Sequence, residues 1–95
     1  MKFNIVVTKI TPSPSGGSAR VFADVRLDSE AGSLEIHGFS VIESDGKPAW
    51  VGFPQKPGKN GKKYFPVIEA VGVLKELIVN AILDAYVGMN QQLAS

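Results

Sequence analysis

The chain has 95 residues, of which 44% are apolar and 20% charged, and its formal net charge is +1. This composition argues against disorder, and the length fits one domain, residues 1–95, whose small core favours a dimer. The absence of cysteine excludes disulfides and thiolate metal sites. Since no signal peptide or apolar run of about 18 residues is present, we expect a cytoplasmic protein without membrane contact.

Four strands are predicted along the first half of the chain. Residues 3–10 are rich in β-branched side chains, which favour a strand. Residues 19–27 alternate between apolar and polar side chains, as a half-buried strand does. Residues 34–43 form the third predicted strand, in which Gly38 indicates a bulge or a close backbone approach. A short fourth strand, residues 49–53, ends at a proline.

The second half of the chain predicts a hairpin turn and one helix. Asp45-Gly46 is a strong turn signal between the third and fourth strands. After a lysine-rich loop, the apolar period changes to that of a helix over Val67–Val87, with Gly88 as its stop and residues 89–95 as a frayed tail. The predicted fold is therefore α+β: a four-stranded antiparallel meander followed by a C-terminal helix on one face.

The predicted helix is more apolar than one sheet can cover. Val71, Leu74, Ile78, Ile82 and Ala85 share one face, and further apolar side chains flank it. Such a helix is expected either to bury its surplus against a second subunit or to pack deeply on its own sheet. For the first alternative, the dimer interface is assigned to Val79, Leu83 and Tyr86.

Residue types that carry catalysis or bind metals are scarce. His37 is the single histidine and lies mid-strand, without the donor spacing of a metal site. No nucleophile motif is present, and GKNGKK, residues 58–63, lacks the glycine spacing and hydroxyl residue of a phosphate-binding loop. We therefore expect no enzyme, no cofactor and no small-molecule substrate.

Positive charge is concentrated between residues 46 and 68. This segment holds five lysines and no acid, whereas the remainder has five basic and nine acidic residues. One interpretation is a solvated loop; the other is a phosphate-binding surface. The candidate contacts of that surface are Lys56, Lys59, Lys62 and Lys63. Of the aromatic residues nearby, Tyr64 is a candidate for stacking on bases, while Trp50 and Phe65 are interpreted as core.

Three further basic residues are candidates for the same surface. Lys75 lies at the flank of the apolar helix stripe, where it either snorkels over the core or marks the edge of a binding surface. Arg20 and Arg26 lie on the polar face of the second strand and are the candidates for reading bases. Because lysine contacts with phosphates carry no sequence information, we expect low sequence specificity.

In their order, these features resemble the stage V sporulation protein G (SpoVG) family, the septation regulators of bacteria. The resemblance covers residues 19–87. FADVRLD resembles the second strand of the family, and FSVIESDGKPAWVGFPQK resembles its hallmark of strand, glycine turn, apolar strand and Pro-x-basic motif. YFPV and NAILDAY resemble the start and the end of the family's helical part.

The resemblance implies a small α+β homodimer that binds DNA or RNA and regulates septation or sporulation. It assigns basic contacts to Lys56, in the Pro-x-basic motif, and to Lys75, when the chain is registered from NAILDAY. The alternative is a dimeric protein-interaction module whose basic loop binds an acidic partner, without nucleic acid.

Overall fold

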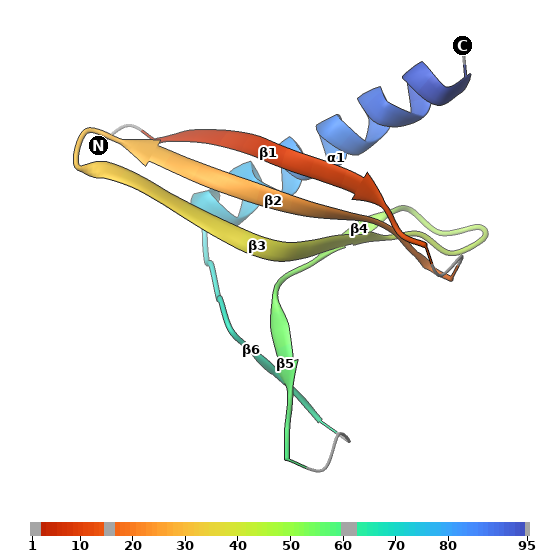
Figure 1. Ribbon diagram of the computed structural model, residues 1–95, viewed down its shortest axis with the longest axis horizontal. Helices are drawn as coiled ribbons and strands as arrows, with labels where there is room; N and C mark the ends of the chain where they lie inside the picture. Colours follow the sequence, from red (N-terminus) through yellow and green to blue (C-terminus); the bar gives the residue numbers. More distant parts are fainter. Residues whose placement is uncertain (1–2, 15–16, 60–62, 95) are drawn as a thin grey trace.

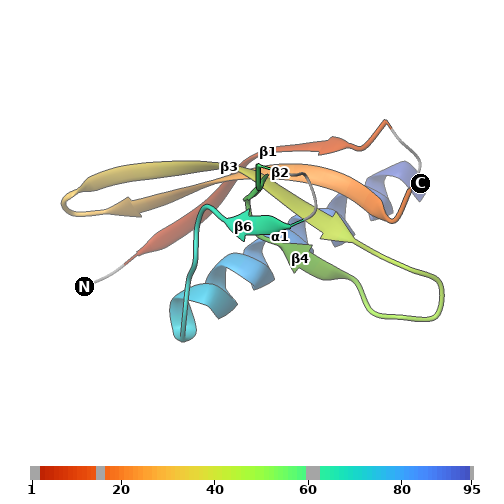
Figure 2. The same cartoon turned by 90° about the horizontal axis from the view of Figure 1, so that it is seen from below.

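A computed structural model describes residues 3–14, 17–59 and 63–94, and only the backbone of residues 90–94. Figure 1 shows a twisted sheet, one long helix lying across it and a thin two-stranded arm that projects away from both. In Figure 2 the helix lies on one side of the sheet only, so the opposite side is left uncovered by the described part of the chain.

The main sheet is an antiparallel meander of four strands in sequence order. Its strands are β1 (Asn4–Pro12), β2 (Ala19–Ser29), β3 (Gly32–Ile42) and β4 (Trp50–Gly52), and neighbours in the chain are neighbours in the sheet. The predicted four-stranded meander followed by a C-terminal helix is confirmed. Such local pairing needs only short connections, because each strand returns beside the previous one.

The predicted turn and the predicted bulge are both present. The backbone amide of Lys47 donates to the carbonyl of Ser44 at 3.1 Å, and Gly46 takes a φ of 77° within this turn. The pairing of β2 with β3 slips at Ala23/Asp24, where Gly38 has a φ of 99°. Because side chains strain the backbone in this region, glycine is the residue both positions require.

The core lies between the sheet and the helix. It is built from the inward side chains of β2, β3 and β4, where the period of two places every second residue toward the helix. Its buried members are Val21, Ala23, Val25, Ile36, Phe39, Val41, Val51, Ile78, Ile82 and Tyr86. The polar face that the sequence assigned to β2 is accordingly the uncovered face of the sheet.

The helix differs from its predicted bounds at both ends. Helix α1 spans Val73–Ala94, so it starts at Val73 rather than Val67 and continues through Gly88. Gly72, with a φ of 71°, breaks the chain direction before it, and its carbonyl accepts the first helical bond from Glu76 at 3.4 Å. The prediction of a frayed tail was wrong for residues 89–94, and Ser95 lies outside the described residues.

One side of α1 faces the core and the other remains exposed. Ile78 and Ile82 are buried, as predicted, and Val71 lies before the helix with 84% of its surface exposed. Three apolar helix residues are exposed on the other side: Val73, Leu77 and Val87. The expectation that the helix carries more apolar surface than the sheet can cover is thus confirmed. Within the described residues, no helix has the length and apolarity needed to cross a bilayer.

Candidate nucleic-acid interface

The lysine-rich segment forms a β-hairpin arm rather than the loop predicted from its sequence. Strand β5 (Gln55–Pro57) pairs with β6 (Tyr64–Pro66) in an antiparallel ladder that is separate from the main sheet. The amide of Gly58 donates to the carbonyl of Lys63 at 2.7 Å and closes the ladder toward the tip. We refer to residues 55–66 as the arm.

The arm is fixed to the body at one narrow root. The amide of Val67 donates to the carbonyl of Pro54 at 3.0 Å, so the two chain segments that leave the arm are held together. Pro54 is buried, and a Cβ placed on Gly38 would lie 3.7 Å from the ring of Pro54. The bulge in β3 therefore lies beside the proline at which the arm leaves the sheet.

One aromatic ring packs along the arm itself. A Cβ added to Gly58 would lie 2.8 Å from Cε2 of Phe65, so the ring occupies the space that a side chain at residue 58 would need. The two aromatic side chains of β6 are nevertheless largely exposed, Phe65 by 50% and Tyr64 by 64%. Phe65 was interpreted as a core residue from sequence, and this interpretation was wrong.

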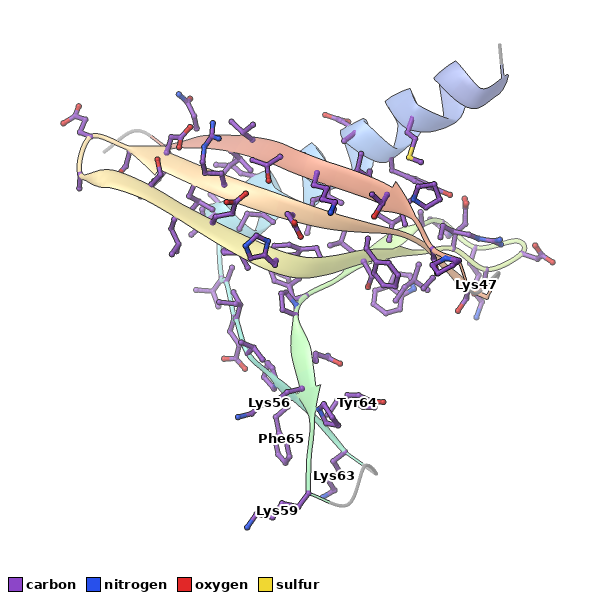
Figure 3. The ribbon with its side chains drawn as sticks, viewed as in Figure 1. Lys47, Lys56, Lys59, Lys63, Tyr64 and Phe65 are labelled. Atoms are coloured by element: carbon purple, nitrogen blue, oxygen red, sulfur yellow. The ribbon has the colours of Figure 1, made fainter. Side chains whose placement is uncertain are left out.

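Positive charge gathers on the arm. Lys56, Lys59 and Lys63 are exposed, and Lys62 lies outside the described residues. Figure 3 shows the lysines distributed along the arm, with Tyr64 and Phe65 between them. Lys47 lies far away, at the β3–β4 turn, so the positive segment of the sequence is divided between two places. Since no acid occurs from residue 46 to 68, no carboxylate of the arm itself competes for these ammonium groups.

The structure brings one helix residue to the root of the arm. Lys75 is exposed and lines a hollow of about 320 Å³ together with Phe53, Pro66 and Ile68. Lys75 and Pro66 of β6 thus line the same hollow, while the role of Lys75 in a binding surface stays a prediction. Glu69 lines the same hollow, and Glu76 directly follows Lys75 in the sequence.

The two strand arginines lie on the main sheet and take part in other contacts. Nε of Arg26 donates to Oδ1 of Asp28 at 2.9 Å, and this hydrogen bond raises the pKa of Arg26 and lowers the pKa of Asp28. Nε of Arg20 donates to the backbone carbonyl of Glu43 at 3.2 Å. Neither arginine is part of the arm, so their role in reading bases stays a prediction.

The side chains assigned to the predicted dimer interface pack against the chain's own core. Tyr86 is buried, with only 7% of its surface exposed. Its hydroxyl donates a hydrogen bond to Oε1 of Glu43 at 2.7 Å. Val79 and Leu83 are half-buried and pack against the core. The predicted interface is therefore not a free surface at Tyr86, because the sheet of its own protomer already covers it.

An ion pair on the uncovered sheet face involves the single histidine. Nδ1 of His37 lies 2.9 Å from Oδ2 of Asp24, whose other oxygen accepts a bond from the Gly38 amide. The bond to Asp24 raises the pKa of His37 above its ordinary value of 6.5, and the same bond lowers the pKa of Asp24 below 3.8. Among the described residues, no group of three or more His, Cys, Asp or Glu could hold a metal ion.

The pair predicts a small pH dependence of stability. Because the pKa of His37 is raised, protonated His37 stabilises the fold fully below pH 6.5, and this contribution is lost as the pH rises through the folded-state pKa. Because the pKa of Asp24 is lowered, ionised Asp24 stabilises the fold above pH 3.8, and this contribution is lost as the pH falls through the folded-state pKa. We expect the melting midpoint to fall as the pH rises above 6.5, because His37 then loses the proton that its bond to Asp24 stabilises. The fall should be absent in His37→Gln. NMR titration should show a lower His37 pKa in Asp24→Asn, and an unchanged pKa would contradict the pairing.

Comparison of the sequence with family models and with curated proteins finds no match. The resemblance to the SpoVG family therefore rests on the quoted motifs alone and stays a prediction.

Proposed function

We propose that this chain is a homodimeric, cytoplasmic nucleic-acid-binding regulator of low sequence specificity, and that its arm makes the main contacts with phosphates. The observation that carries the proposal is the arm: an acid-free hairpin with exposed lysines that projects away from the body. Lysine side chains of this kind bind phosphates as mobile point charges. No catalytic activity and no cofactor form part of the proposal.

The shape of the arm supports contact with a polymer more than contact with a small molecule. A two-stranded ribbon fits the major groove of B-form DNA, and it presents its cations over a length that several phosphates can span. The exposed rings of Tyr64 and Phe65 offer apolar contacts between the lysines. A small anion would leave most of these side chains unused.

The family resemblance supports the proposed regulatory role, and exposed apolar side chains of α1 support the proposed dimer. Of the motifs that resemble the SpoVG family, FADVRLD lies on β2, the hallmark motif runs from the end of β3 through β4 into β5, and NAILDAY lies on α1. For the dimer, the exposed Val73, Leu77 and Val87 on α1 supply apolar surface that a second protomer would cover. A dimer would present two arms, which doubles the number of phosphate contacts.

A second candidate function is a module that binds an acidic protein. The hollow at the root of the arm favours it, because apolar side chains there lie beside Lys75. An acidic peptide with an apolar anchor would satisfy both features. Nucleic acid and such a peptide are expected to compete for the lysines.

Fluorescence anisotropy tests the proposed function. Labelled duplex DNA, single-stranded DNA and RNA of random sequence would be titrated with the protein from about 50 to 200 mM salt. We expect binding whose log K falls linearly with log salt, and which unlabelled nucleic acid competes away more effectively than polyglutamate. Absence of binding at the lowest salt would reject the proposal and leave the protein-interaction module.

A further inference from the structure

The uncovered face of the main sheet carries two exposed aromatic rings. Phe22 of β2 is 43% exposed and Trp50 of β4 is 55% exposed. Trp50 was interpreted from sequence as a core residue, and this interpretation was wrong, because the helix covers only the opposite face (Figure 2). Large aromatic side chains normally bury much of their surface, so two of them on an open face indicate a surface that binds something.

The two rings lie near one row across the sheet. Phe22 pairs with Ser40 of β3, and Ser40 pairs with Gly52 of β4. Trp50 is one pair further along, opposite Ile42, but its ring leans back over Gly52: a Cβ added there would lie 3.8 Å from Cζ3 of Trp50. With strands about 4.8 Å apart, the row places the rings on two sides of a small serine.

Small residues shape the ground between the rings. A Cβ at Gly52 would lie 2.9 Å from Oγ of Ser40, so glycine at this position lets the serine and the indole approach each other. In the next row, Cδ1 of Ile42 would lie 3.5 Å from the same added Cβ, so an apolar side chain lies beside the indole. We call this patch, which has an aromatic ring at each side, the seat; flat groups stack on exposed rings of this kind.

The charges around the seat favour an anionic ligand. Arg20 lies two residues before Phe22 on β2, and Lys9 of β1 lies opposite Asp24, two residues after Phe22; both cations are exposed. Of the neighbouring acids, Asp24 is paired with His37. The carboxylate of Glu43 instead accepts the hydroxyl of Tyr86, a helix residue of the covered side. Cations next to open aromatic faces match a ligand that carries both flat rings and phosphates.

Resting on the proposed function, we propose that this face is a stacking platform for unpaired bases, so that the preferred polymer is single-stranded. The rings of Phe22 and Trp50 stack on two bases, while Lys9 and Arg20 hold the adjoining phosphates. Single-strand binders combine these elements, because every base has a flat face and each phosphate a charge. A duplex keeps its bases stacked inside, so it can use the arm but not the platform.

The intrinsic fluorescence of Trp50 reports directly on binding to the platform, since Trp50 is the only tryptophan in the sequence. Titration with oligothymidylate is expected to quench the fluorescence of Trp50, whereas titration with a duplex should leave it unchanged. Alanine at Phe22 or Trp50 should weaken single-strand binding about 5- to 150-fold per ring and leave duplex binding and the salt slope unchanged. Trp50→Phe and Phe22→Tyr, which keep a ring, serve as matched controls, and melting curves confirm that each variant is folded.

The outcomes separate the platform from the function on which it rests. Selective loss of single-strand binding, with recovery in the ring-keeping variants, supports the platform. Equal losses on both polymers, or none, overturn it while leaving phosphate binding by the arm intact. If the wild type binds no polymer, the proposed function fails as well. If the alanine variants convert a dimer to a monomer in sedimentation, the face is an interface between two copies and the proposal is wrong.

Discussion

Replacing Phe39 by alanine is expected to lower the free energy of unfolding by about 3–5 kcal/mol, the largest effect on stability that we expect from a single side chain. Phe39 is fully buried, and its ring meets that of Phe53 edge-on, with centroids 5.1 Å apart and an interplanar angle of 73°. The substitution removes this contact and leaves a cavity between β3 and the helix. Domains of this size are stable by only about 5–15 kcal/mol, so the loss is a large part of the total.

Thermal unfolding followed by circular dichroism measures this effect. Each kcal/mol lost should lower the melting midpoint by about 4–8 °C in a domain of this length. Phe22→Ala is the matched control: it removes the same ring from the open face and should change the stability by only about 0.5 kcal/mol. If the two variants lost equal stability, the open face of the sheet would have to be packed against something.

Replacing Lys59, Lys62 and Lys63 by glutamine is expected to give the largest change in binding. Each neutralised phosphate contributes about 0.9 to the slope of log K against log salt on duplex DNA. If all three lysines contact phosphates, their loss flattens the slope by about 2.7 per protomer and weakens binding at 0.1 M salt by about two to three orders of magnitude. Anisotropy titrations across the salt range measure both quantities.

The same three positions offer a control that keeps the charge. Replacing the lysines by arginine preserves the positive charge, so the salt slope should remain near that of the wild type. Neither triple variant should alter the melting midpoint by much, because Lys59 and Lys63 are exposed and none of the core residues lies in the arm. An unchanged slope in the glutamine variant would show that the phosphates bind elsewhere.

The sheet could be predicted because its local signals agree with one another. Alternation over β2, the bulge glycine at residue 38 and the turn at Asp45-Gly46 each specify a step of the meander. The helix was predicted with the right type but the wrong start, since the apolar residues before Val73 continue its pattern. The positive φ of Gly72, which breaks the chain there, leaves no mark in the apolar pattern.

The arm was missed for a different reason. Its strands are three residues long, and both β5 and β6 end in proline, which removes donors from the ladder and argues against a strand. The arm is held together instead by the pairing of Lys56 with Phe65 and by the packing of the Phe65 ring beside Gly58. These contacts join residues that are several positions apart, so no local sequence pattern predicts them. The lysines themselves could be identified from sequence as a cluster, though not the separation of Lys47 from it.

The exposure of Trp50 could not be predicted from its sequence neighbourhood. Alternation shows that Val51 and Trp50 point to opposite faces, and both residues are apolar. Which face is covered is decided by the helix, whose buried Ile78 and Ile82 meet the side that carries Val51. A single helix leaves the second face open, so the larger residue of the pair is the exposed one.

Because the arm joins the body at one narrow root, substitutions in the arm and substitutions in the main sheet or helix have different consequences. The chain leaves the body after Pro54 and returns to it at Val67, and one backbone hydrogen bond joins these two residues. None of the described residues between them, 55–59 and 63–66, belongs to the buried core. Substitutions, insertions or deletions in that stretch should therefore change the stability of the fold little, while they directly change the charge and the length of the arm. Under the proposed function, a lineage of such proteins could change what it binds through this one segment while the main sheet and the helix stay the same.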